Sequence, residues 1–330
     1  MCGIFGTTLR YSSEVIERKL ELMNFRGPDH TGIKEFDVSS ELKLTFGHVR
    51  LSILDLDARS NQPFVYNENI SIVFNGEVYN YKELKNQYLS DVILRTTSDT
   101  EVICAMYEKF GTACVNYLNG MFAYVIYDSK NKILVGARDR LGKKPFYYWH
   151  TSRGFEFASQ LKVIQYGHQL EVDELSRQFY VLQGYIPDPY CILKGVKKLR
   201  AGQQLIYHLE NNQLEICNYW NIFDNTCGFT VPKSFDEAKE TVRDLLFDSV
   251  KKRLRADVPV GIFLSGGIDS SLTSAIVSKI NHNICAYTIG FDNARYDESQ
   301  YAKNVAKSLG IPIKVSMCVG EDQHQIFDDY

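Results

Sequence analysis

Short apolar runs separated by turn residues fill the first two hundred positions of the chain. Residues 70–74 form one such run, and it stops at Asn75-Gly76, which predicts a strand followed by a turn. Four more runs of this kind predict further strands, at residues 121–127, 133–137, 155–159 and 204–208. Because several of these runs are apolar nearly throughout, we expect sheets that are covered on both faces.

Two helices are predicted within the same part of the chain, over residues 13–24 and 100–110. The second follows Ser98 and Asp99, whose side chains are good helix N-caps. A polar, irregular stretch over residues 211–234 then predicts a linker, so we place a first domain at residues 1–210.

The pattern changes after the predicted linker. Ser234 and Glu237 form a capping box at the start of a helix, and one apolar stripe along this helix comprises Ala238, Val242, Leu245, Leu246, Val250 and Leu254. Strands and helices then alternate: strand 260–264, helix 270–280, strand 284–289, helix 298–309 and strand 311–315. This order predicts a parallel, doubly wound α/β sheet as a second domain over residues 235–330.

Composition narrows the class of protein. The formal net charge is −3 and the basic residues are scattered, so no nucleic-acid partner is predicted. No apolar stretch approaches twenty residues and no secretory signal begins the chain, so we expect no membrane partner and a cytoplasmic location. The eight cysteines form no C-x-x-C pair and no H-E-x-x-H motif occurs, which argues against zinc. For seven of these cysteines we expect buried thiols.

The eighth cysteine, Cys2, stands where removal of Met1 would make it the N-terminal residue. It would then carry both a thiol and a free α-amine. The ordinary pKa of such an amine is about 7.7–8.0, so part of it is uncharged near neutrality and can accept the thiol proton. An adjacent amine is one of the recognised bases that activate a nucleophile.

Five short motifs follow one another along the first domain: Met1-Cys2-Gly3-Ile4-Phe5-Gly6, Arg26-Gly27-Pro28-Asp29, Gly47-His48-Val49-Arg50-Leu51-Ser52-Ile53, Asn75-Gly76-Glu77-Val78-Tyr79-Asn80 and Ser98-Asp99-Thr100-Glu101. The set resembles the glutaminase domain of the asparagine synthetase family, a class II glutamine amidotransferase. Residues 138–148 and 157–159 continue the resemblance, which spans residues 1–220. It implies an α+β N-terminal-nucleophile fold with αββα layers.

The resemblance also implies a reaction. Cys2 would attack the side-chain amide of glutamine, form a thioester and release ammonia. Asn75, through its side-chain amide, and Gly76, through its backbone N–H, would stabilise the oxyanion, and we expect a tight Asn-Gly turn to present both. An ordinary hairpin turn is the other interpretation of Asn75-Gly76.

Three charged residues are implied to bind the amino-acid end of glutamine. Arg50 would hold the α-carboxylate through a bidentate fork. Asp99 would hold the α-ammonium group, with Glu77 as a helper. A surface charge for Arg50 and a helix cap for Asp99 are the structural alternatives. We assign His48 no catalytic role, and we expect residues 26–29 to form a turn in the pocket wall.

A glycine-rich loop lies between a predicted strand and helix of the second domain: Leu264, Ser265, Gly266, Gly267, Ile268, Asp269, Ser270 and Ser271. Two glycines allow successive N–H groups to form an anion-binding nest at a helix N-terminus. The loop is not a Walker A motif, and it resembles the pyrophosphate loop of ATP pyrophosphatases. The resemblance implies ATP binding here and at Ile289 and Gly290, with Mg²⁺ held in part by Asp269. A serine-capped glycine turn is the plain structural alternative.

These resemblances predict a glutamine-dependent amidotransferase that uses ATP to amidate a carboxylate, with aspartate as the expected acceptor. The alternatives are an ammonia-donor glutaminase with a non-catalytic second domain, and an enzyme for another carboxylate such as a sugar acid. An inert regulatory relative is disfavoured by the intact predicted site. The chain stops at Tyr330, before the rest of the synthetase pattern. We therefore expect an incomplete synthetase half, or one completed by a homodimer or a partner chain.

Overall fold

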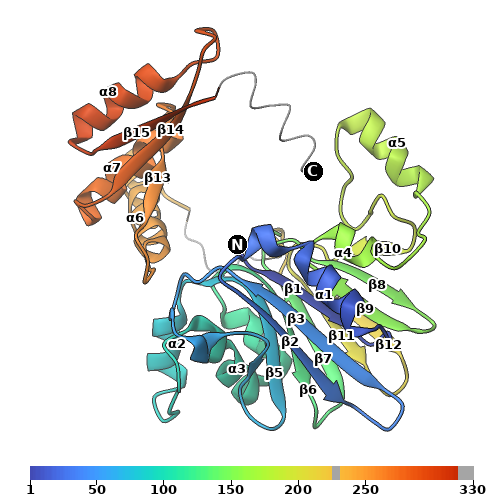
Figure 1. The fold of residues 1–330 in the computed structure, drawn as a ribbon. Helices are drawn as coiled ribbons and strands as arrows, with labels where there is room; N and C mark the ends of the chain where they lie inside the picture. Colours follow the sequence, from blue (N-terminus) through green and yellow to red (C-terminus); the bar gives the residue numbers. More distant parts are fainter. Residues whose placement is uncertain (225–230, 319–330) are drawn as a thin grey trace. The chain divides into compact units, whose positions relative to one another are not determined.

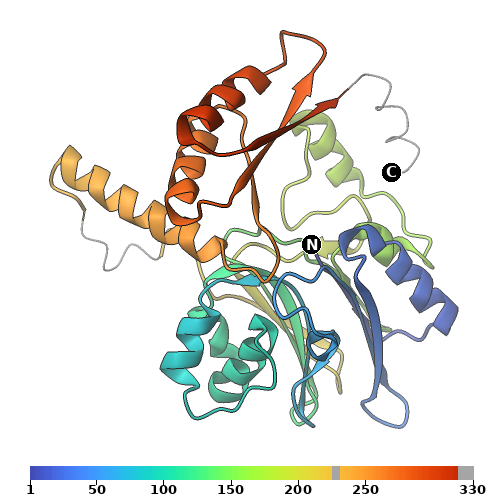
Figure 2. The ribbon, with the colours of Figure 1, turned by 60° about the vertical axis from the view of Figure 1, so that its left-hand side comes forward.

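The structure is a computed structural model that describes residues 1–224 and 231–318. The chain forms two compact units, Met1–Phe229 and Thr230–Tyr330 (Figures 1 and 2).

The first unit contains two six-stranded sheets in which all paired strands are antiparallel. In one sheet the strand order is β10-β8-β9-β1-β3-β2, with β1 Gly3–Thr7, β2 His30–Asp37, β3 Lys43–Arg50, β8 Tyr147–Thr151, β9 Gly154–Ala158 and β10 Val196–Lys198. In the other the order is β12-β11-β7-β6-β5-β4, with β4 Phe64–Val65, β5 Ile70–Val78, β6 Gly120–Asp128, β7 Ile133–Arg138, β11 Gln203–His208 and β12 Gln213–Asn218.

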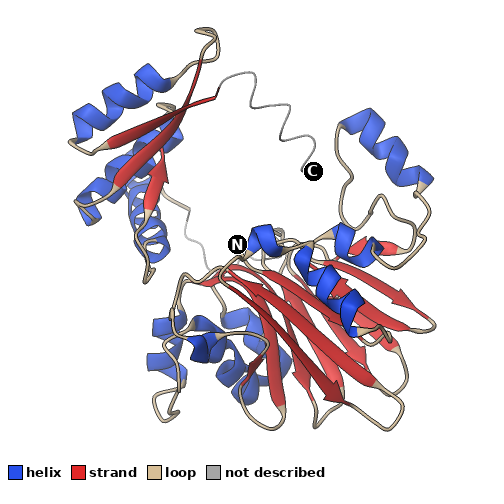
Figure 3. Cartoon of the chain, in the orientation of Figure 1, coloured by secondary structure: helices blue, strands red, loops and turns tan. Residues whose placement is uncertain are grey.

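Alternation along the strands explains why both sheets are covered on both faces. On β1, Ile4 belongs to the core between the sheets, whereas its neighbour Phe5 belongs to the core beneath α1 (Ser13–Glu21) and α4 (Leu161–Gln165). On β5, Val73 faces the central core and Phe74 packs beneath α2 (Tyr81–Tyr88) and α3 (Asp99–Phe110). The layers are therefore helix, sheet, sheet, helix (Figure 3). This confirms the αββα expectation for the first domain.

Helix ends follow local chemistry. Ser12 caps α1 by accepting from the Val15 N–H, and Ser98 caps α3 by accepting from the Thr100 N–H. The α3 helix ends at Gly111, which has a φ of +57°. Short 3-10 turns occur at Asn24–Arg26, Ala58–Ser60 and Gly111–Tyr117. The remaining helix of this unit is α5, Glu174–Gln183, of which only Ser176 is buried.

The predicted linker begins too early. Residues Gln213–Asn218 form β12, which pairs with β11 along its whole length and extends the second sheet. Most of β12 is exposed because it lies at the sheet edge. An edge strand that is solvated on its outer side needs few apolar residues, so its polar sequence resembled a loop.

The second unit contains a parallel sheet in the order β13-β14-β15 with three helices. Their bounds are α6 Phe235–Arg253, β13 Gly261–Phe263, α7 Ile268–Ile280, β14 Cys285–Phe291, α8 Ser299–Leu309 and β15 Ile313–Cys318. The predicted alternation of strand and helix is confirmed here, with boundaries that shift by one to three residues.

Only one face of the parallel sheet is covered by the described helices. Val277 of α7 and Ala306 of α8 pack in one core with Ala286 of β14. Strands that follow chain order with crossovers of one hand place both helices on the same face. On the other face Phe263 is 85% exposed and Ile289 is 55% exposed. The doubly wound arrangement is therefore wrong for the described strands, which are wound on one side.

The predicted capping box of α6 forms with one change. Ser234 Oγ accepts from the Glu237 N–H at 3.2 Å, while Glu237 Oε2 accepts from the N–H of Lys233 at 2.7 Å. The apolar stripe is only half covered, because Val242 and Leu245 are exposed and Val250 and Leu254 pack against the core. Within residues 1–224 and 231–318, no helix has both the length and the apolar character to cross a bilayer.

The cysteines of the described residues are all free thiols. Cys104, Cys114 and Cys191 are buried as expected. Cys217 is exposed on the edge strand β12, and Cys285 and Cys318 are only half-buried, so the expectation of a buried thiol is wrong for these three. Cys227 lies outside the described residues.

Candidate active site

Cys2 lies directly before β1, and the N-terminus is at one end of the paired sheets (Figure 1). Its thiol contacts the backbone of Leu51, the residue after β3: the Leu51 N–H donates to Sγ at 3.4 Å, and Sγ lies 3.6 Å from the Leu51 carbonyl oxygen. Burial raises the pKa of this thiol, although the Leu51 hydrogen bond and the N-terminal amine oppose the effect. The resting residue is therefore a thiol, and attack on an amide requires a base.

The predicted base, the α-amine of Cys2, becomes a free amine only after Met1 is removed. The structure includes Met1, and burial is the main cause that lowers the pKa of the Met1 amine below its ordinary value. A lower pKa increases the uncharged fraction near neutrality, which is the form that accepts a proton.

Asn75 and Gly76 do not form the predicted turn. The strand β5 continues through both residues to Val78, and its register pairs Asn75 with Ala123 and Gly76 with Phe122 on β6. Gly76 is required for another reason: a Cβ there would lie 2.2 Å from the backbone oxygen of Met121. The turn expectation was wrong because an Asn-Gly pair signals a hairpin only when the chain reverses, and here close strand packing selects the glycine.

The side chain of Asn75 is fully buried, and within the described residues neither its oxygen nor its nitrogen has a hydrogen-bond partner. A buried amide that is unpaired at both ends is costly unless a ligand or water satisfies it. His48 lies nearby in the fold, because its Nε2 lies 3.1 Å from the carbonyl oxygen of Phe74, the residue before Asn75. Burial lowers the pKa of His48 to about 3, so it stays neutral and links the two sheets.

Arg50 ends β3 and is buried, but its terminal nitrogens are already engaged. Nη1 donates to the Asp57 carbonyl at 3.1 Å and to Asn61 Oδ1 at 2.7 Å. Nη2 donates to the carbonyls of Leu54 and Asp55. The two-pronged fork that the sequence analysis expected is thus occupied by the protein itself. What remains for a substrate carboxylate is the positive charge and the Nε–H.

Asp99 and Glu77 form a carboxylate pair at the start of α3 and the end of β5. Asp99 Oδ2 accepts from the Val78 N–H at 2.8 Å, which ties the two elements together. Burial raises the pKa of both carboxyls, and the proximity of Asp99 raises that of Glu77 further. Ser98 is the cap of α3, so Asp99 is free of the capping role and lies in the first helical turn.

Two basic residues at this site were not predicted as contacts of Cys2: Lys144 had no expected role, and Arg26 was expected only in a turn of the pocket wall. Lys144 is 3% exposed; burial lowers the pKa of its amine, and Glu77 and Cys2 partly restore it. Arg26 donates from Nε to the Cys2 carbonyl at 3.0 Å, and its buried Nη2 has no partner among the described residues. Both lie in motifs that carried the resemblance. Their burial beside Cys2 could not be read from the sequence, because Lys and Arg are normally surface residues.

The raised pKa of Glu77 predicts a pH-dependent stability. A carboxyl whose folded pKa lies above its unfolded value stabilises the fold at low pH and loses that contribution as pH rises. Glu77→Gln keeps the shape of the side chain but cannot titrate. The melting temperature of the variant, relative to that of the wild type, should therefore rise as the pH increases from about 5 to about 8. We expect a gain of about 2–4 °C. The exposed Glu68→Gln is the matched control; a difference for Glu77→Gln that stays flat or shrinks with pH would contradict the assignment.

The glycine-rich loop of the second unit follows β13 and leads into α7, which begins two residues earlier than expected, with Gly267 as its N-cap. Gly266 has a φ of +86°, and a Cβ there would lie 2.6 Å from Tyr301 Cβ. Ser265 Oγ and Ser270 Oγ lie 3.0 Å apart. Ser271 Oγ is buried without a partner among the described residues. These features suit a phosphate nest.

Ile289 and Gly290 lie near the carboxyl end of β14, next to β13. The Leu264 N–H donates to the Tyr287 carbonyl at 2.9 Å, which places the start of the loop beside β14. Ligands of parallel sheets bind at this edge. Asp269 lies exposed in the first turn of α7. Over the described ranges, no three His, Cys, Asp or Glu side chains cluster to hold a metal. Asp269 would thus contribute a single ligand to a phosphate-bound Mg²⁺.

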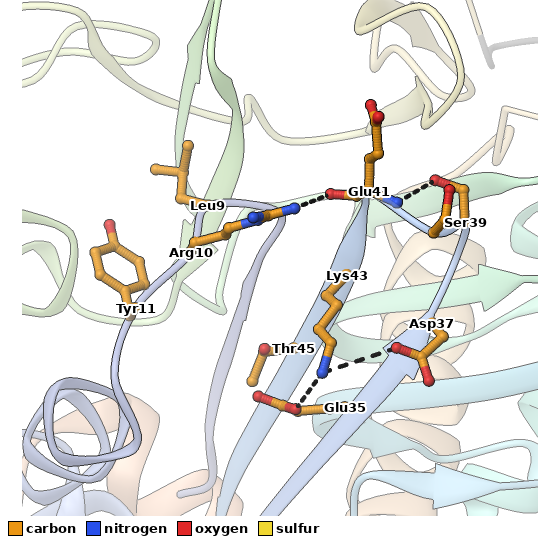
Figure 4. A pocket seen from close by; sticks show the side chains of 10 residues that line it. Leu9, Arg10, Tyr11, Glu35, Asp37, Ser39, Glu41, Lys43 and Thr45 are labelled. Carbon is orange, nitrogen blue, oxygen red and sulfur yellow. Dashed lines mark hydrogen bonds and ion pairs between the residues drawn. The ribbon is translucent and has the colours of Figure 1, made fainter.

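A pocket of about 410 Å³ lies elsewhere on the first unit, beside the hairpin of β2 and β3 (Figure 4). Its charged side chains satisfy one another: Lys43 Nζ lies 3.5 Å from Glu35 Oε2 and 3.8 Å from Asp37 Oδ1. Such exposed pairs contribute little. None of the predicted site residues lines this pocket, and we assign it no role.

Comparison with known proteins decides the family. The model of a family described as "Glutamine amidotransferase domain" matches residues 1–220. The chain belongs to the glutamine amidotransferase family. A second model, "Asparagine synthase", matches residues 241–329, so an asparagine synthase domain follows the amidotransferase domain. Both family expectations of the sequence analysis are confirmed.

Relatives of this amidotransferase carry different names. A Methanocaldococcus jannaschii protein, provisionally named asparagine synthetase (glutamine-hydrolyzing) 2, is 38% identical over 92% of this chain and 62% of its own length. Amidase chyE of Penicillium rubens is 33% identical over 97% of this chain and 49% of its own length. The chain thus spans about half to three fifths of the length of these relatives. A solved allosteric regulatory enzyme of purine biosynthesis has a TM-score of 0.50 at 14% identity, covering 96% of this chain and 80% of its own. That likeness concerns the fold alone.

Proposed function

We propose that this amidotransferase hydrolyses L-glutamine at Cys2 and supplies the ammonia to its asparagine synthase domain, where aspartate is amidated to asparagine at the cost of ATP. The observation that carries the proposal is the fully buried Asn75 amide, which has no partner among the described residues and lies two residues from Glu77, whose charge acts on the Cys2 thiol. An enzyme of this family needs such a group to stabilise an oxyanion.

The proposed reaction begins with transfer of the Cys2 thiol proton to the α-amine, which belongs to Cys2 itself once Met1 is removed. The sulfur attacks the side-chain carbonyl carbon of glutamine, and the electron pair of the carbonyl bond moves to oxygen. The Asn75 side chain and the Gly76 N–H stabilise that oxyanion. When the carbonyl re-forms, the C–N bond breaks and ammonia leaves with the proton from the amine. Water then hydrolyses the thioester to glutamate.

Glutamine binding is assigned to three charged groups. The Arg50 charge and its Nε–H attract the α-carboxylate, because its other four N–H groups hold the protein. Asp99 attracts the α-ammonium group, with Glu77 beside it. A cationic ligand lowers the pKa of both carboxyls toward the anionic form, which offsets part of the cost of their burial.

The residues of the second unit fit ATP. The loop from Ser265 to Ser271 offers backbone N–H groups at the start of a thirteen-residue helix, and the orphaned Ser271 hydroxyl adds a donor. Asp269 would help to hold Mg²⁺. ATP bound there would supply the activation that a carboxylate needs before ammonia can attack it. Aspartate is the proposed acceptor because one relative bears the name of an asparagine synthetase.

The test uses the full-length protein. Glutamine labelled with ¹⁵N in the side-chain amide is supplied with ATP, Mg²⁺ and aspartate, and glutamate, free ammonia and asparagine are measured by mass spectrometry. We expect glutamate in step with ¹⁵N-asparagine. Labelled free ammonia without labelled asparagine would overturn aspartate as acceptor. The absence of glutamate would overturn the whole proposal.

A further inference from the structure

The loop between β3 and β4 is wrapped around the guanidinium group of Arg50. We call residues 51–61 the Arg50 loop. Its carbonyls at Leu54, Asp55 and Asp57 and the side chain of Asn61 together accept from both terminal nitrogens of Arg50. The position of the arginine and the shape of this loop are therefore one structural unit.

Asp55 extends this unit to a second segment of the chain. Its side chain is almost completely buried, with 4% of the residue exposed. Asp55 Oδ2 accepts from the Thr97 N–H at 2.7 Å and lies 3.2 Å from Thr97 Oγ1. Thr97 stands two residues before Asp99, on the approach to α3. The backbone carbonyl of Asp55 thus accepts from Arg50, and its side chain accepts from Thr97, which lies just before Asp99.

The backbone of Asp55 supports the same conclusion. Its φ is +47°, a left-handed conformation that is uncommon for a residue other than glycine. The conformation lets the carbonyl oxygen accept from Arg50 Nη2 while the carboxylate turns to Thr97. The partly exposed Arg59 places its Nε 3.2 Å from Asp55 Oδ2, where its positive charge compensates the buried carboxylate.

We propose that Asp55 is a positioning residue that fixes the spacing between Arg50 and Asp99 and so sets the affinity of the site for the amino-acid end of glutamine. The inference rests on the proposed function of the first domain. Two opposite charges held at a set distance match the α-ammonium and α-carboxylate groups of an amino acid. Loss of that spacing weakens binding before it affects the chemistry at Cys2, because Cys2 is contacted by Arg26 from outside the loop and by Leu51 only at its first residue, directly after β3.

A merely structural role for Asp55 would give a different result. If the residue only stabilised the fold, a variant would lose activity through the folded fraction, so kcat and stability would fall together. A positioning role raises KM while kcat stays close to that of the wild type. The ratio of the two kinetic constants is therefore the decisive readout.

The experiment compares Asp55→Asn with Asp91→Asn in the full-length protein. An asparagine at position 55 has one acceptor oxygen, so it can no longer accept from both the Thr97 N–H and the Asp57 N–H, and it loses the negative charge that faces Arg59. We expect the KM for glutamine to rise about 10–100-fold while kcat changes less than about threefold. Asp91 is an exposed aspartate of the same unit, outside the Arg50 loop. Asp91→Asn should leave both constants near those of the wild type.

Alkylation of Cys2 by iodoacetamide is measured alongside, by mass spectrometry of the N-terminal peptide. This reagent does not need the amino-acid site, so its rate should be the same in Asp55→Asn and the wild type. An equal loss of alkylation and of kcat, or an unchanged KM, would overturn the positioning role. If the wild type itself does not hydrolyse glutamine, the proposed function fails instead, and the two failures are thus told apart.

Thr97→Val keeps the inference testable if Asp55→Asn does not fold. It removes the hydroxyl donor to Asp55 Oδ2 and keeps the N–H donor. We expect its KM to rise about threefold or more with kcat retained. A KM equal to that of the wild type, in a variant that melts at the wild-type temperature, would count against the spacing role.

Discussion

Replacement of Cys2 by alanine should abolish the proposed glutamine hydrolysis, with an expected loss in kcat of at least about 10⁴-fold, because it removes the sulfur that would form the thioester. Amidation from added ammonium chloride should continue at the rate of the wild type, since the variant leaves the asparagine synthase domain unchanged. The measurement is glutamate release from glutamine, with asparagine formation from ammonium chloride in a parallel assay.

Cys217→Ala is the matched control, since Cys217 is an exposed thiol of the same unit. It should keep full glutaminase activity. Residual hydrolysis in Cys2→Ala above a few per cent would contradict the role of Cys2. The mass of the purified wild type tests the base separately: retention of Met1 in an active enzyme would rule out the α-amine of Cys2 as proton acceptor.

Asn75→Ala should lower kcat about 10²–10³-fold with little change in KM. The oxyanion exists mainly in the transition state, so a group that stabilises it contributes little to ground-state binding. The buried amide of Asn75 has no partner among the described residues. Removal of this amide therefore breaks no hydrogen bond to a described residue, and we expect the variant to fold. Steady-state kinetics of glutamate release measure both constants.

Asn131→Ala provides the comparison for this substitution. Asn131 lies in the β6–β7 turn, where its side chain bonds Asp128 at 2.8 Å, far in sequence from Cys2. We expect kinetics like those of the wild type. If Asn75→Ala instead raised KM and left kcat intact, Asn75 would be a binding group and the oxyanion assignment would be wrong.

That the sheets of the first unit are covered on both faces could be predicted, because several of their strands are apolar nearly throughout. Adjacent residues such as Ile4 and Phe5 do enter different cores. The order of the αββα layers followed from the family resemblance, since helices on both faces of a sheet would give the same apolar pattern. The start of α3 followed from the cap chemistry of Ser98. Cys2, Asn75 and Asp99 were found through the order of their motifs.

Other features depend on tertiary contacts that no local pattern encodes. The Asn-Gly pair within β5 and the polar edge strand β12 are placed by their neighbours in the sheet. The occupied fork of Arg50 arises from carbonyl groups, which every residue carries. Lys144, in the loop between β7 and β8, is buried where the charge of Glu77 on β5 acts on it, and this proximity arises from the tertiary fold.

The proposed site is divided between the two layers of the sandwich. Cys2 directly precedes β1 and Arg50 ends β3 in one sheet, and Asn75 and Glu77 belong to β5 in the other. A nascent chain in which one layer had formed without its partner would therefore hold a nucleophile with no oxyanion donor, or a donor with no nucleophile. Such a chain could not liberate ammonia. Under the proposed mechanism, glutamine hydrolysis therefore requires that both sheets have folded and packed together.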